Sequence, residues 1–212
     1  SFASLMPGAL MYSEVWAGAL IAASAGAYSL GLWRTGAAAG VLALFFRELA
    51  LPYVLISLLL AWRRSRRSEL GVLVVGLAGY SIYFALHALA ATSRITPADL
   101  EASWTQAWIR FGGVRFLLTA SRVGMLLACP LWATALYLPF ALLGLAGGSS
   151  PIGRRLLLTV GAYLTALCVL GRPVQFYWGA VYAPLLGFGA AWSAPACYDL
   201  VRAMLARPSK RA

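Results

Sequence analysis

Charged residues are scarce in this 212-residue sequence. Charged residues make up 11% of it, whereas soluble domains average about a quarter. The deficit is mostly acidic, since 6 Asp and Glu stand against 17 Lys and Arg and leave a net charge of +11. Apolar residues account for 62% of the sequence, and the mean hydropathy is +0.80. This composition excludes an ordinary soluble domain and is typical of a chain that lies in a membrane.

Residues that bind metals or form disulfides are also scarce. The only histidine is His87, which excludes a site built from several histidines. Cys129, Cys168 and Cys197 lie in or beside apolar segments and form no Cys-x-x-Cys pair, so neither a disulfide framework nor a zinc site is predicted. No nucleotide-binding loop, hydrolase triad or haem ligand pair is present. The sequence therefore indicates no metal and no cofactor.

The apolar residues fall into blocks of the length that crosses a bilayer, about 20 residues per helix. The blocks predicted to span or enter the membrane are 12–32, 36–62, 70–91, 131–145, 156–170 and 176–192, with a shorter helix at 115–127. We therefore predict an all-α polytopic membrane protein with about six to seven transmembrane or half-membrane helices.

The domain organisation follows from the same blocks. Residues 1–194 are predicted to form one transmembrane domain, and 195–212 a basic cytoplasmic tail. The chain begins Ser1-Phe2, without an initiator Met. We expect that the N-terminal part of a longer protein precedes it.

Arginines in the gaps between the blocks predict the orientation, because basic loops stay in the cytoplasm. The densest cluster, 63–67, should be cytoplasmic, and counting spans from it places the C-terminus there too. Basic charge in such gaps does not indicate nucleic acid as a partner. On this topology most basic residues are cytoplasmic, and six face outward: Arg47, Arg94, Arg110, Arg115, Arg122 and Arg172.

The block 36–62 allows two interpretations, because Arg47-Glu48 interrupts it. It is either one tilted helix or two half-helices that meet at this dyad. Half-helices are tolerated where protein or water covers them. The second interpretation is favoured, because it places Arg34 with the other cytoplasmic arginines and keeps an ion pair out of the bilayer centre.

Charged residues inside apolar blocks are candidates for function. The Arg47-Glu48 dyad is one, with a structural ion pair as the alternative and Glu14 as a possible partner. Arg115 and Arg122 share a helical face and suit a phosphate or diphosphate. Their alternative role is to reach lipid headgroups.

Three further polar side chains are predicted near the outer face. His87 is either a helix–helix hydrogen-bonding residue or a site residue. Gln175 and Tyr182 could hydrogen-bond a sugar, although aromatic residues at that depth are also ordinary interfacial residues. Acidic residues expected to be solvated are Glu69, Asp99 and Glu101.

An extracytoplasmic amphipathic helix is predicted to begin at Thr96. It carries Leu100, Trp104, Trp108 and Phe111 at helical spacing. Such a helix lies on the membrane surface as an anchor or covers a lipid-linked substrate as a lid.

Three stretches of sequence resemble a known group of enzymes. They are YSEVWAG at 12–18, FRELALPY at 46–53 and FYWGAVYAPL at 176–185. They resemble bacterial GT-C-type membrane glycosyltransferases, and more closely the proteins described as cell-surface glycopolymer formation proteins. The resemblance implies transfer of a sugar from a polyprenyl-phosphate-linked donor, outside the bacterial cytoplasmic membrane. It places the catalytic acid in a loop before Ser1, so no catalytic residue is assigned.

The leading hypothesis is therefore a membrane glycosyltransferase whose partners are a lipid-linked sugar donor and membrane lipids. Arg47, Arg115 and Arg122 would hold the phosphate. The other candidate substrate-binding residues are Glu48, His87, Gln175 and Tyr182. A transporter or flippase for a lipid-linked or anionic solute is the alternative, and a non-catalytic membrane subunit is the third. The sugar, acceptor and oligomeric state stay open.

Overall fold

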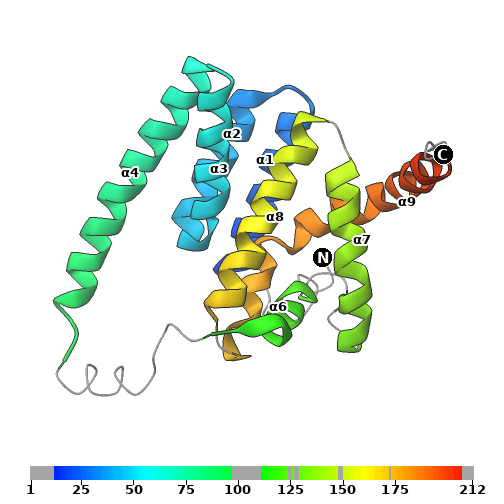
Figure 1. The fold of residues 1–212 in the computed structure, drawn as a ribbon. Helices are drawn as coiled ribbons and strands as arrows, with labels where there is room; N and C mark the ends of the chain where they lie inside the picture. The colour runs from blue at the N-terminus through cyan, green and yellow to red at the C-terminus, as the bar shows by residue number, and fades with distance from the viewer. Residues whose placement is uncertain are drawn as a thin grey trace.

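The computed structural model describes residues 12–96, 111–123, 126, 129–147, 150–171 and 173–206. These residues form helices and connections and no strand, which confirms the all-α prediction (Figure 1). The elements are α1 Ser13–Ser29, α2 Trp33–Phe46, the 3₁₀ helix η3 Glu48–Ala50, α3 Leu51–Arg63, α4 Arg67–Thr92, α6 Gly113–Ser121, α7 Leu131–Gly147, α8 Pro151–Val169, the 3₁₀ helix η4 Pro173–Val181 and α9 Ala183–Leu205.

The block 36–62 is two helices, as the favoured interpretation expected. Arg47 has φ −158° and ψ 127°, so the backbone leaves the helical conformation there and η3 and α3 follow. Pro52 lies in the first turn of α3, a position where its missing N–H breaks no helical hydrogen bond. Trp33 lines the same cavity as Arg64 and Arg66, so the start of α2 and the end of α3 lie at one end of the bundle.

The C-terminal segment differs from the prediction of a span at 176–192 and a separate tail. The 3₁₀ helix η4 has a kink at Gln175, with φ −93° and ψ 18°, and a new helix begins at Ala183. That helix, α9, continues through Pro195 to Leu205. A proline inside a helix removes one hydrogen bond and bends the axis without always ending the helix. The predicted boundary after residue 194 therefore falls inside one element.

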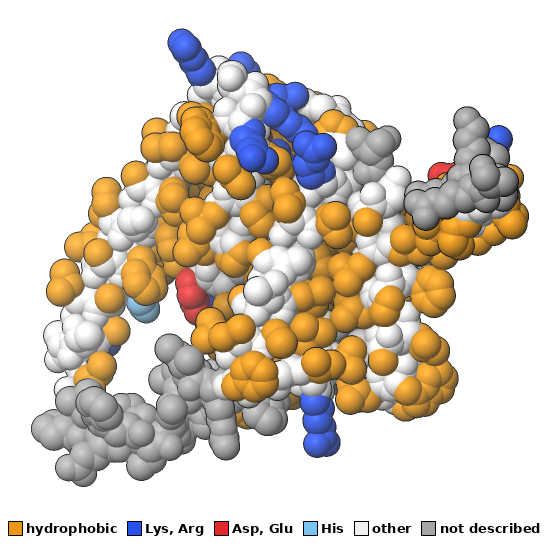
Figure 2. All heavy atoms as spheres, viewed as in Figure 1, with side chains coloured by type: hydrophobic (Ala, Val, Ile, Leu, Met, Phe, Trp, Pro, Cys, Tyr) orange, Lys and Arg blue, Asp and Glu red, His pale blue; other side chains and the backbone are white. Residues whose placement is uncertain are grey.

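Among the described residues one large buried core runs through the bundle beside a small second cluster, and much of the outside is apolar. Ile21, Leu44, Tyr53, Leu156 and Leu185 are almost fully buried. Large apolar side chains cover much of the face seen in Figure 2, α4 included. Soluble monomers rarely expose apolar patches larger than a few hundred Å².

Two described helices, α4 and α8, are long and apolar enough to cross a membrane. The helices α2 and α7 are apolar but shorter. Helices α4, α7 and α8 are longer than the blocks 70–91, 131–145 and 156–170 that predicted them, whereas the blocks 36–62 and 176–192 are each divided in the structure. The amphipathic helix expected from Thr96 falls mostly outside the described residues.

Helices α7 and α9 pack through glycines, which lets their backbones approach closely (Figure 1). A Cβ atom at Gly144 would collide with the carbonyl oxygen of Gly189, and one at Gly189 with the carbonyl oxygen of Ala141. By contrast, a Cβ atom at Gly187 would meet no atom within 4 Å.

This packing predicts opposite effects for two neighbouring substitutions in α9. Gly189→Ala should lower the melting temperature, because overpacking costs about 1–3 kcal/mol. Gly187→Ala should keep or raise it, because alanine stabilises a helix interior by about 0.5–1 kcal/mol over glycine. Thermal unfolding of both variants, followed by circular dichroism, measures the difference. Equal melting temperatures would contradict the close α7–α9 contact.

Candidate functional site

The predicted Arg47-Glu48 dyad lies at the break between α2 and α3 and forms a cluster with Glu14. Arg47 Nε lies 3.0 Å from Glu14 Oε1 and 3.5 Å from Glu48 Oε1. The Glu14 contact is an ion pair rather than an aligned hydrogen bond. Glu14 is buried in the first turn of α1, where the helix dipole favours a carboxylate. Glu48, by contrast, is 54% exposed.

The three segments singled out in the sequence meet around this cluster. The rings of Tyr12 and Tyr177 lie 5.5 Å apart, and those of Trp16 and Phe46 lie 6.3 Å apart. Gly18 packs against the backbone of Ala180 so closely that a Cβ atom would collide with its carbonyl oxygen. The segments 12–18, 46–53 and 176–185 are therefore one site in space, although more than 120 residues separate the second from the third.

Two buried polar atoms in η4 have no hydrogen-bond partner among the described residues. They are Gln175 Oε1 and Trp178 Nε1, one an acceptor and the other a donor. Gln175 is only 4% exposed. A buried polar atom without a partner is costly, at about 1–3 kcal/mol. Water or a ligand beside these atoms would satisfy them, and Gln175 as a site residue stays a prediction.

Tyr182 is buried and packs inside the bundle. Its hydroxyl lies 2.9 Å from Ser121 Oγ, and its ring stacks on Tyr163 with the centroids 5.4 Å apart. The Tyr163 hydroxyl in turn donates to the Leu49 carbonyl at 2.6 Å. Tyr182 therefore holds α6, α8 and η4 together and has no free surface for a sugar.

The other predicted residues lie around the cluster at different depths. Arg122 ends α6 and is partly buried, beside Val123, which packs on Ala180 of η4. Arg115 is exposed at the start of α6. His87 is exposed on α4, where its ring stacks on Tyr83 at 6.0 Å. The structure thus brings Arg47 and Glu48 together with Glu14, buries Gln175 in η4 and leaves Arg122 partly buried at the end of α6. Arg115 and His87 lie at the surface.

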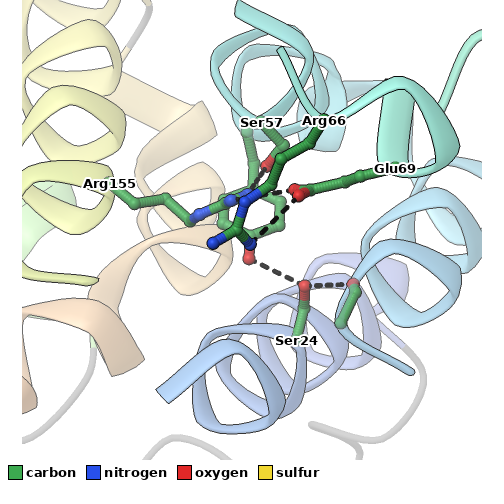
Figure 3. Close-up of polar contacts among 7 residues, drawn as sticks. Ser24, Ser57, Arg66, Glu69 and Arg155 are labelled. Carbon is green, nitrogen blue, oxygen red and sulfur yellow. Dashed lines mark hydrogen bonds and ion pairs between the residues drawn. The ribbon is translucent and has the colours of Figure 1, made fainter. Parts of the chain in front are cut away.

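A second charged cluster, at the other end of the bundle, was not predicted from the sequence. Arg155 is 3% exposed. Its Nη1 donates to Ser57 Oγ at 2.6 Å and its Nη2 to Glu69 Oε1 at 3.1 Å (Figure 3). The guanidinium carbon lies 3.6 Å from the centre of the Tyr28 ring, a cation–π contact. One side chain from α8 therefore contacts residues of α1, α3 and α4.

The expectation that Glu69 is solvated was wrong. Glu69 is 2% exposed, and besides Arg155 it pairs with Arg66 at 3.6 Å. The i,i+3 spacing of Arg66 and Glu69 was a signal for the local pair. Arg155 is 86 residues from Glu69 in the sequence, so no local sequence pattern predicts this pair.

The buried pair predicts a large loss of stability when either partner is removed. Glu69→Gln and Arg155→Gln should each cost about 3–5 kcal/mol, because each leaves an uncompensated buried charge. The double variant should lose less than the sum of the single losses. Unfolding free energies of the three variants measure this coupling. Arg154→Gln, at the exposed neighbouring position, is the matched control and should leave stability nearly unchanged.

Comparison with protein families, with curated proteins and with solved structures finds no match to this chain. Its function therefore has to be inferred from the two charged clusters, around Arg47 and around Arg155.

Proposed function

We propose that this chain is the helical membrane part of a glycosyltransferase that takes a sugar from a polyprenyl-phosphate-linked donor, on the outer face of a bacterial cytoplasmic membrane. The observation that carries the proposal is the meeting of the three GT-C-like segments around Glu14, Arg47 and Glu48.

The membrane location is supported by three features. Helices α4 and α8 have the length and composition of spans. Large apolar side chains cover much of the outer surface. Basic side chains gather at the end where α3 joins α4 (Figure 2), as expected for the cytoplasmic end. The Glu14–Arg47–Glu48 cluster lies where α2 breaks, at the other end of that helix and level with the middle of α4, where Phe45 packs on Tyr80.

The charge balance of the cluster assigns its role. One guanidinium stands against two carboxylates, Glu14 and Glu48. A net negative charge repels a phosphate, so Arg47 is better suited to positioning the exposed Glu48 than to holding the donor phosphate. Carboxylates accept hydrogen bonds from sugar hydroxyls. In this proposal Glu48 and Gln175 contact the sugar, and Arg122, with Arg115 on the same helix, contacts the phosphate.

Two substitutions test the proposal in vesicles that contain the full product of the gene. Glu48→Gln and Arg122→Gln should each lower sugar transfer from a polyprenyl-phosphate donor by about tenfold or more, because each removes a charged hydrogen bond worth about 1.5–3 kcal/mol. The measurement is transfer of radiolabelled sugar at matched protein levels.

Exposed residues of α9 provide the controls. Asp199→Asn and Arg202→Gln change charge by the same amount far along the chain and should leave transfer unchanged. Arg47→Ala is not a clean probe, because it strands the buried Glu14. No transfer by the wild type from a broad panel of donors would retire the proposal in favour of transport or assembly. Full activity in both test variants would remove Glu48 and Arg122 from the site.

A further inference from the structure

A basic cavity of about 510 Å³ opens at the end of the bundle where α3 joins α4, away from the Glu14–Arg47–Glu48 cluster. Helices α1, α2, α4 and α8 contribute to its wall, together with the turn between α3 and α4. Its charged lining residues are Arg64, Arg66, Arg67, Arg155 and Glu69. Four guanidinium groups and one carboxylate leave it with a formal charge of +3. A cavity of this size and charge suits an anion with a small polar headgroup.

The floor of the cavity is formed by Arg155 and Tyr28. Arg155 is held by Ser57 and Glu69, so its position is set before any ligand arrives. The Tyr28 hydroxyl is buried and makes no aligned hydrogen bond among the described residues, and the charged group that interacts with it besides Arg155 is Glu69.

The rim of the cavity is the tight turn between α3 and α4. Ser65 has φ 54°, and the Arg66 N–H donates to the Ala61 carbonyl, which closes the turn. Three arginines, Arg64, Arg66 and Arg67, are thereby brought together. Burial and the neighbouring charges of Arg66 and Arg155 lower the pKa of Arg64.

The first turn of α4 adds backbone donors to this rim. The N-cap residue of α4 is Arg66, whose side chain does not cap the helix. Ser68 and Glu69, in the first turn of α4, line the cavity. The N–H groups of a first turn have no acceptor within the helix, and they favour anions.

An apolar groove lies between α2 and α4, next to the cavity along α4. It has a volume of about 530 Å³ and is lined by Ala38, Val41, Leu42, Phe45, Gly71, Val72, Val75 and Gly76. Gly71 and Val72 lie one helical turn beyond Arg67 and Ser68 of the cavity. A Cβ atom at Gly71 would meet no atom within 4 Å, so the groove is open there.

From the position of the groove beside the cavity we infer that the chain binds an anionic phospholipid, with its phosphate among the cavity arginines and an acyl chain in the α2–α4 groove. A basic cavity next to an apolar groove on the same two helices matches both parts of such a molecule. A free phosphate compound would use the cavity alone. Basic pockets between helices on the cytoplasmic side are known sites for acidic lipid headgroups. The inference does not depend on the proposed sugar transfer, which involves the separate Glu14–Arg47–Glu48 cluster.

Native mass spectrometry of the full chain in neutral detergent tests the site with three probes. They are short-chain phosphatidic acid, phosphatidylcholine of the same chain length and inorganic phosphate. The wild type should bind phosphatidic acid in preference to the other two. Arg64→Gln/Arg67→Gln should raise the dissociation constant for phosphatidic acid by about tenfold or more, because two charged contacts are lost. It spares both residues that pair with Glu69.

Gly71→Leu tests the groove, because its side chain would fill the space of the acyl chain without a clash in the fold. It should weaken phosphatidic acid binding severalfold. Gly79→Leu, at an equally open position further along α4, is the matched control. Arg94→Gln/Arg202→Gln controls for the loss of two charges at exposed positions.

Each outcome decides the inference. Loss of binding in the rim and groove variants, with both controls at wild-type affinity, would support it. Inorganic phosphate that binds as tightly as phosphatidic acid, or a Gly71→Leu variant that matches Gly79→Leu, would overturn the lipid assignment. Equal binding by the rim variant and its charge control would remove the arginine cavity as a site.

Discussion

The buried ion pair between Arg155 and Glu69 is the contact on which the arrangement of the bundle most depends. Burying two charges is costly, and the cost is recovered only where every donor and acceptor is well placed. Arg155 satisfies this by using Ser57, Glu69 and the Tyr28 ring together. Since these residues come from α3, α4 and α1, the pair sets how four helices meet. The same guanidinium forms the floor of the basic cavity.

The two charged clusters have opposite local charge. In one Glu14 and Glu48 outnumber Arg47, and in the other four arginines surround Glu69. Ligands of different chemistry therefore suit the two clusters. Hydroxyl-rich groups match the carboxylates, and a phosphate matches the arginine cavity.

Between the two ends the helices pack through small residues. Gly18 lies against Ala180, Gly179 against Ala120, and Gly144 against Gly189. Each contact brings backbone against backbone, so large apolar side chains are left to cover the outside of the molecule. This division is characteristic of helices that associate within a lipid environment, where apolar burial between helices gains little.

The sequence alone determined the helical class, because its apolar blocks are long and its strand signals are few. It also favoured the break at Arg47-Glu48, where two charges and Pro52 interrupt an apolar run, and it suggested Glu14 as a partner. The helical class and the break are local features, set by residues within a few turns of one another. Only the tertiary structure decided that Glu69 is buried and that Tyr182 packs inside. It alone placed Arg155 beside Glu69, because that contact joins segments 86 residues apart and depends on how the helices pack.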